Sequence, residues 1–187
     1  MTRMKMFVGL AMLGCLGWLT GLSTAAEDKK EGKEKAGHEF VMKASACGLA
    51  EVNLSQLAAT RTRNPAVREF AQRMVVDHTQ ANRQLLDMAN RQQIPLAKTM
   101  DDKHQKLFEK LSKMDGAEFD RAYLDGLVKD HEEAVKLFED ESKNGKNDAL
   151  KKWAGKTLPS LKKHLESARN LSKKDKDKSD TRKDASK

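Results

Sequence analysis

Four ionisable residues interrupt the apolar stripes of the predicted helices, one on each of the four long helices. They are Glu51, His78, His131 and His164. A buried carboxylate or imidazole is costly unless it is hydrogen-bonded, paired with a charge or bound to a metal ion. Imidazoles together with a carboxylate suit zinc, iron, copper or manganese. The four residues are therefore candidate ligands of a divalent transition-metal site.

The first two of these residues are expected at the same height in the fold. Glu51 precedes the predicted turn at Asn64 by 13 residues (64 − 51), and His78 follows that turn by 14 (78 − 64). Antiparallel helices joined at the turn bring such residues level, because every helical residue rises by the same distance. Glu51 and His78 should therefore lie side by side.

The match is poorer in the second predicted hairpin. His131 precedes Gly145 by 14 residues (145 − 131), whereas His164 follows it by 19 (164 − 145). Five extra residues correspond to about 7 Å of rise in a straight helix. We therefore expect His131 to join the first pair, and His164 to lie about a turn away unless its helix is distorted. Pro159 should kink or break that helix, because proline removes an internal hydrogen bond.

Three further residues are candidates for orienting the ligands. Asp77 and Asp130 precede two of the histidines in the sequence, and Tyr123 lies on an apolar stripe. A hydrogen bond to the second ring nitrogen commonly fixes a metal-binding histidine. The alternative to a metal site is a structural network, in which Glu51 accepts hydrogen bonds from the histidines and Tyr123 assists. Such networks also fix the register of packed helices.

The ligand pattern of the di-iron bundle enzymes is missing. Those proteins carry Glu-x-x-His pairs on two helices. Here the residues three positions before the histidines are Val75, Val128 and Leu161. A carboxylate-bridged oxidase or an iron-mineralising centre is therefore not expected.

The hydrophobic periodicity predicts four long helices and one short one. Charged residues make up 34% of the chain and aromatic residues 5%, which favours helices over sheets. Asn64-Pro65 should cap one helix, and Asn144-Gly145 should end another. The expected helices are 38–63, 65–92, 101–113, 116–144 and 147–171. This order predicts an all-α fold, an antiparallel four-helix bundle of the ferritin-like type whose crossover contains the short helix.

The N-terminal residues have the three-part pattern of a secretory signal. Basic residues precede an apolar run over 6–22, and small residues at 23–26 precede the first charged stretch. The expected location is extracytoplasmic, either periplasmic or secreted, with association with the outer membrane as a further option. No later segment is long and apolar enough to span a membrane. The expected domains are a signal peptide at 1–26, a charged linker at 27–39, a bundle at 40–171 and a disordered Lys/Asp-rich tail at 172–187.

Three other residues with reactive side chains are given no part in the site. Cys47 would be the only cysteine left after removal of the signal, so an internal disulfide is excluded. Its place on an apolar stripe favours a core position. His38 and His104 lie on the predicted linker and crossover, and both are expected to be exposed to solvent.

The formal net charge of +8 does not indicate a nucleic-acid partner. Over the predicted bundle, basic and acidic residues alternate at helical spacings, which is typical of a solvated face. No basic stripe carries the aromatic side chains on which bases stack. The charged tail at 172–187 is instead a candidate for contact with the surface of the cell envelope.

Five stretches of the chain together resemble one known family. They span about residues 40–171 and are 51–54, 70–78, 119–123, 130–132 and 158–165. In these stretches the chain resembles the domain-of-unknown-function family 4142, exported proteins often labelled ferritin-like or outer membrane protein. The resemblance implies the fold and the exported location. It implies no reaction.

The sequence therefore predicts an exported ferritin-like bundle, more in keeping with a non-enzymatic protein, that binds a divalent metal through inward Glu and His residues. Two alternatives remain at this point. One is a purely structural or stress-related envelope protein with a buried polar network. The other is a small metalloenzyme that acts on an oxidant.

Overall fold

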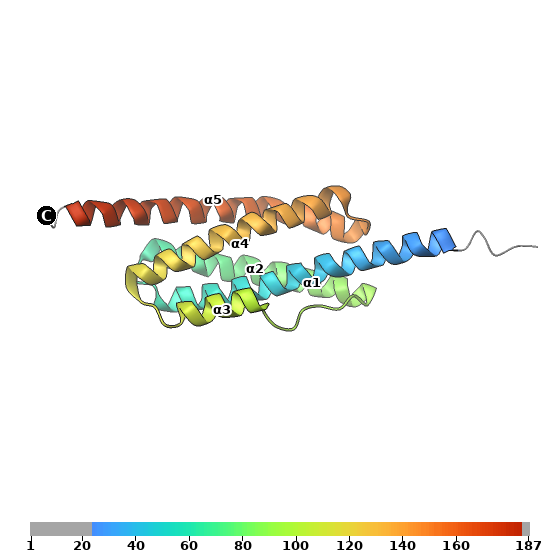
Figure 1. Cartoon of the computed structure of the whole chain (residues 1–187), viewed down its shortest axis with the longest axis horizontal. Coiled ribbons are helices and arrows are strands. Elements are labelled where there is room, and N and C mark those ends of the chain that lie inside the picture. The colour runs from blue at the N-terminus through green and yellow to red at the C-terminus, as the bar shows by residue number, and fades with distance from the viewer. Residues whose placement is uncertain (1–23, 185–187) are drawn as a thin grey trace, which may run out of the picture.

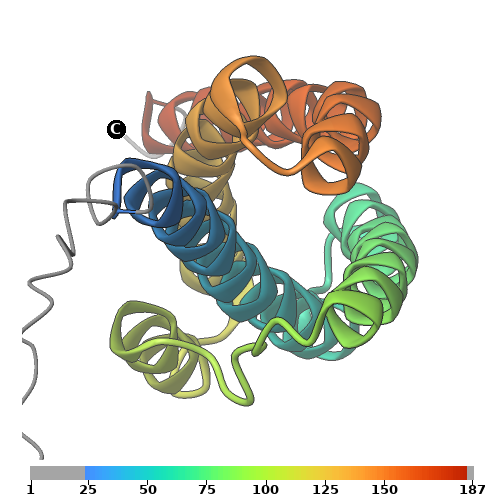
Figure 2. The same cartoon turned by 90° about the vertical axis from the view of Figure 1, so that its right-hand side faces the viewer.

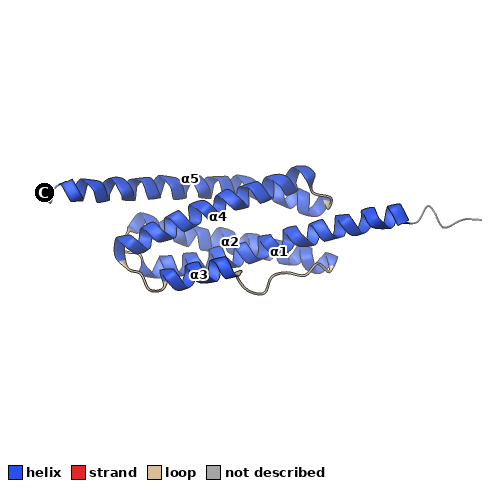
Figure 3. Ribbon diagram, in the orientation of Figure 1, coloured by secondary structure: helices blue, strands red, loops and turns tan. Residues whose placement is uncertain are grey.

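Helices α1 (Thr24–Arg61) and α2 (Pro65–Gln92) form the first hairpin of the structure, a computed structural model that describes residues 24–184 (Figure 1). A connection carrying the short helix α3 (Asp102–Leu111) leads to the second hairpin, formed by α4 (Gly116–Asn144) and α5 (Asp148–Asp184). Side chains are described for residues 37–176. All regular structure in the described range is helical (Figure 3), which confirms the all-α prediction.

Local signals in the sequence set where these helices begin. The side chain of Asn64 accepts a 3.1 Å hydrogen bond from the backbone N–H of Ala66, and Pro65 occupies the first helical position of α2. Proline is well placed there because its missing N–H would have no partner inside the helix. Asp101 caps α3 in the same way, accepting a 3.0 Å hydrogen bond from the N–H of His104.

The four long helices are arranged so that each packs against two others. Helix α1 contacts α2 and α4, and α5 contacts α4 and α2, while α3 lies against α1 and α4. Seen end-on, the long helices surround a common axis (Figure 2). Neighbouring long helices run in opposite directions (Figure 1). This arrangement turns one face of every long helix toward the same interior.

The interior consists of two separate apolar clusters. One is built around Leu54, Met74 and Leu127, and the other around Phe40, Phe138 and Trp153. On every long helix the chain passes from one cluster to the other. Between the clusters lies a layer of buried polar residues, with Glu51, His78, His131 and His164 on α1, α2, α4 and α5.

Both ends of the bundle differ from the expectation based on sequence. Residues 27–39, expected as a linker, belong to α1, and residues 172–184 of the expected disordered tail continue α5. Ser172 is buried and its hydroxyl donates a 2.8 Å hydrogen bond to Asp125 of α4, so α5 packs beyond residue 171. The signal peptide predicted at 1–26 lies outside the described residues, except that residues 24–26 begin α1. Among the described helices, none contains a stretch long and apolar enough to cross a membrane.

Candidate metal centre

Three histidines from three different helices meet in the polar layer. His78 of α2, His131 of α4 and His164 of α5 each offer one ring nitrogen, and these nitrogens all lie within 4.8 Å of one another. The centroids of the three rings are 5.3–5.6 Å apart. The residues are 7%, 0% and 4% exposed, respectively. Such spacing lets one small ion contact all three imidazoles.

The ring of His131 is held by the backbone of its own helix. Its Nδ1 lies 3.0 Å from the carbonyl oxygen of Leu127. A carbonyl only accepts hydrogen bonds, so Nδ1 carries the proton and Nε2 keeps its lone pair. Nε2 is buried without a hydrogen-bond partner in the described part of the chain.

The ring of His164 is held from a neighbouring helix. Its Nε2 lies 2.8 Å from Oδ2 of Asp77 on α2. This contact places the proton on Nε2 and leaves the lone pair on Nδ1, which is buried and unpartnered among the described residues. Nε2 of His78 is likewise buried and unpartnered. Each of the three rings therefore has one buried nitrogen free to bind a ligand.

The surroundings keep these imidazoles neutral. Burial, followed by the neighbouring histidines, holds the pKa of His78 well below its usual value, and burial with the nearby His164 lowers the pKa of His131 to about 4. Burial also lowers the pKa of His164, although the hydrogen bond to Asp77 opposes the shift. Neutral imidazole is the form that binds metal ions.

Glu51 adds a carboxylate beside this cluster. It is 1% exposed, and its Oε1 lies 3.4 Å from Nδ1 of His131. Neither oxygen has a hydrogen-bond partner among the described residues. Burial raises the pKa of Glu51 well above its usual value, and the charge of Asp130 adds to this shift. A nearby cation would offset the cost of the buried carboxylate.

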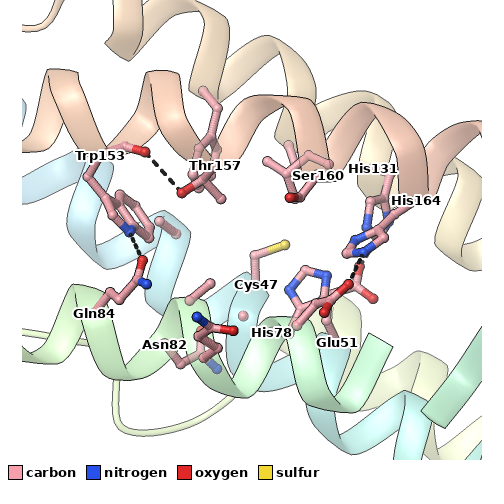
Figure 4. A pocket seen from close by; sticks show the side chains of 18 of the residues that line it. Cys47, Glu51, His78, Asn82, Gln84, His131, Trp153, Thr157, Ser160 and His164 are labelled. Atoms are coloured by element: carbon pink, nitrogen blue, oxygen red, sulfur yellow. Dashed lines mark hydrogen bonds and ion pairs between the residues drawn. The ribbon is translucent and has the colours of Figure 1, made fainter. Parts of the chain in front are cut away.

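The cluster forms part of the wall of a cavity of about 310 Å³. The cavity extends from the histidines past Cys47 and Asn82 to Trp153, whose indole N–H donates to Gln84 (Figure 4). Cys47 is partly buried. The apolar stripe correctly predicted a position facing the interior, but the thiol borders this cavity and not a closed core.

Two of the predicted orienting residues lie elsewhere. Asp130 is 2.7 Å from Nζ of Lys103 and 3.5 Å from Nε2 of His104, both on α3. The hydroxyl of Tyr123 is 2.9 Å from that of Ser55. Only Asp77 holds one of the three clustered rings. The polar network predicted as an alternative is not formed, because no hydrogen bond joins Glu51 to a histidine or to Tyr123 in the described residues.

His104 is the polar residue that the sequence interpretation placed wrongly. It was expected at the surface of the crossover, yet it is only 4% exposed. Its Nδ1 contacts the cap residue Asp101 at 2.7 Å, and α3 turns its ring toward Asp130 of α4. The amphipathic pattern of residues 102–111 was the available signal, because a short helix with one apolar face packs that face against its neighbours.

The position expected for His164 was also wrong, and Pro159 is not the reason. Helix α5 continues through Pro159 without a break. The two hairpins had been counted from different ends of their turns. Counted from the helix ends, His78 lies three residues further from its turn than Glu51, with 13 against 10, and His164 three further than His131, with 16 against 13. Side chains tilt toward the N-terminus of their helix, which offsets this shared difference.

The fold and the geometry define a class of protein, an all-helical bundle with three buried, convergent histidines. Residues 22–171 match the model of the domain of unknown function DUF4142, and the chain belongs to that family. No protein curated for its function matches the sequence.

Two solved structures share the fold. One is a fragment of DUF305 from Deinococcus radiodurans, which is 14% identical with a TM-score of 0.66 over 74% of this chain and 96% of that one. The other is CopM in its Cu(II)-bound form, 14% identical with a TM-score of 0.62 over 73% of this chain and 95% of that one. At this identity the likeness concerns the fold alone.

Proposed function

We propose that this protein binds one divalent transition-metal ion through His78, His131 and His164. One observation carries the proposal. Three helices bring three buried imidazole nitrogens within 4.8 Å of one another, and a nitrogen of each ring lacks any other partner in the described structure. Leaving three such groups unsatisfied costs about 1–3 kcal/mol each, and a shared ion would satisfy them together.

Copper is the first candidate for the ion. A site of neutral imidazoles suits zinc, copper and iron, and Cu²⁺ has the highest affinity of the divalent first-row metals for a given site. The solved structure of CopM, which has a similar fold, contains Cu(II). Cu(II) is therefore the ion to test first, with zinc, iron and manganese as competitors.

Glu51 is proposed as a neighbour that stabilises the charge of the ion. Its carboxylate lies next to His131 but outside the group of three mutually close nitrogens. Replacing Glu51 with glutamine keeps the volume of the side chain and removes its charge. The affinity for the ion should fall by about 10-fold while the ion still binds, a loss smaller than removal of a histidine would cause.

We further propose that the protein works outside the cytoplasm, as a ferritin-like bundle. The signal pattern at 1–26 and the family membership support the location. The hairpin–crossover–hairpin order supports the description of the bundle. The Lys/Asp-rich end of α5 remains the proposed contact with the envelope surface.

The deciding experiment uses the protein purified without a histidine tag. Elemental analysis and calorimetric titration with Cu(II) should give one ion per chain, and saturation should stabilise the fold by about 2.7 kcal/mol when free ion is 100-fold above Kd. His78→Ala, His131→Ala and His164→Ala should each weaken binding more than the roughly 10–100-fold that loss of an outer hydrogen-bond partner costs. His38→Ala, which is remote from the cluster, is the matched control. Equal affinity of the wild type and the triple-alanine variant would refute the proposal.

A further inference from the structure

The two sides of the histidine cluster are packed very differently. On the side of α1 and α2 where these helices join, one helical turn from the polar layer, the interior is filled by the fully buried side chains of Leu54, Met74 and Leu127. One turn away on the opposite side, every long helix presents a small residue toward the cavity. These are Gly48, Ala81, Ala134 and Ser160. The cavity exists because no large side chain occupies this second side.

The cavity reaches solvent between α2 and α5. Among its lining residues, Gln80 of α2 and Lys156 and Ser160 of α5 are exposed, whereas the histidines at its inner end are buried. Figure 4 shows Ser160 on α5 above the space between Cys47 and the imidazoles. A volume of about 310 Å³ is several times the roughly 30 Å³ that one water molecule occupies in the liquid. The path is therefore wide enough for a small molecule to reach the cluster.

The chemistry of the wall favours an anionic ligand. Three imidazoles supply three of the four positions around a tetrahedral ion, and a three-histidine site of this kind commonly keeps the fourth for water or substrate. An ion bound by neutral imidazoles retains its positive charge at the inner end. Lys156 adds a positive charge near the mouth, and Asn82 and Thr157 offer hydrogen-bonding groups between the two.

We infer that the ion held by His78, His131 and His164 keeps one coordination position open to this cavity, and that a small anion of a few atoms binds the ion there. The inference rests on the proposed metal site. It goes further by assigning a ligand class, since a metal bound only for storage or structure needs no cavity. No reaction is implied beyond exchange of a metal-bound water for the anion.

The test uses azide and the protein loaded with an equimolar amount of Cu(II). Azide should produce a new ligand-to-metal charge-transfer absorption and alter the electron paramagnetic resonance spectrum, both saturating with azide concentration. Ala81→Leu fills the cavity beside His78. It should retain Cu(II) and reduce the affinity for azide at least 10-fold. Ala66→Leu, the same change at an exposed position of α2, should bind azide like the wild type.

A second variant guards against misfolding of the first. Ser160→Leu narrows the exposed mouth of the cavity and should also weaken azide binding while Cu(II) remains bound. If Cu(II) binds to the wild type and azide leaves both spectra unchanged, the open position is refuted and the metal site stands. Equal azide affinity in the wild type and both cavity variants would refute the role of the cavity. If Cu(II) itself does not bind, the proposed function fails and this inference fails with it.

Discussion

Nε2 of His164 lies 2.8 Å from Oδ2 of Asp77, so a carboxylate near the surface of α2 fixes the ring of a buried residue on α5. The side chain of Asp77 is 40% exposed and that of His164 is 5% exposed. The hydrogen bond joins the two hairpins at the level of the cluster. It also selects the tautomer of His164 whose lone pair faces the other two imidazoles.

Replacing Asp77 with alanine should weaken metal binding without unfolding the protein. The ring of His164 would lose the acceptor that fixes its tautomer and orientation, and such losses cost about 10–100-fold in metal affinity. Calorimetric titration with Cu(II) measures the change. Asp87→Ala, which removes another carboxylate from α2 at an exposed position, should leave the affinity unchanged. An unchanged affinity of Asp77→Ala would show that the carboxylate does not orient the ring.

The folded protein without metal should lose stability as the pH falls below neutrality. Burial lowers the pKa of His131 to about 4, whereas an imidazole in the unfolded chain titrates near about 6.5. Between these values the unfolded chain binds more protons than the folded chain, so acid favours unfolding. The contribution of His131 is complete above about pH 6.5, and up to about 3 kcal/mol is lost as the pH approaches 4.

Urea unfolding at pH 7, 6 and 5 in the presence of a chelator measures this dependence. Between pH 7 and pH 5 the wild type should lose more stability than His131→Gln, which has no group that titrates in this range. The raised pKa of Glu51 gives a slope of opposite sign, since its protonated form is favoured in the folded state. That slope is present in both proteins and therefore cancels in the comparison. Identical pH slopes would mean that His131 is not held neutral by the fold.

The helices could be predicted because their boundaries depend on local chemistry. Asn64 and Pro65 act on the residues beside them, and the structure begins α2 at Pro65. The end of α4 at Asn144 follows from the same kind of signal. Periodicity was sufficient to place the four ionisable residues on inward faces, because burial of the apolar stripe determines which face of a helix is inward.

The details of the site depend on tertiary packing and could not be read from the same patterns. Asp77 and Asp130 both precede a clustered histidine, yet Asp77 reaches His164 and Asp130 reaches α3. The difference arises because α5 covers one aspartate and α3 the other. The sequence contains no local signal for which neighbour covers which position, and for the same reason the burial of His104 was missed.

Asp130 should prove to be a stabilising residue and not a member of the metal site. Its side chain is 1% exposed and contacts Lys103 and His104. Burial raises the pKa of Asp130, but these two neighbours outweigh it and lower the pKa overall. Removing one partner from a buried charged pair costs about 3–5 kcal/mol. Asp130→Ala should lie near the low end of that range, about 3 kcal/mol, because the side chain of Lys103 is 48% exposed.

A matched control is available at the same lysine. Glu133 also lies 2.7 Å from Nζ of Lys103, but its side chain is 68% exposed. Glu133→Ala should therefore cost less than about 1 kcal/mol. Chemical denaturation measures both losses, and titration with Cu(II) should show unchanged affinity in both variants. A large loss of affinity in Asp130→Ala alone would return this residue to the site.

The thiol of Cys47 should be unreactive in the folded protein although it borders the cavity. Burial raises the pKa of Cys47 well above its usual value, and the carboxylates of Glu51 and Asp130 add to this shift. The thiolate is the nucleophilic form, so little of the reactive species is present at neutral pH. With Cys15 replaced by serine to leave a single thiol, labelling by a disulfide reagent should be at least about 10-fold slower in the native protein than in denaturant. Glu51→Gln should accelerate native labelling, because it removes the nearest listed negative charge from the thiol without opening the fold, whereas an equal rate in both proteins would leave burial as the whole cause.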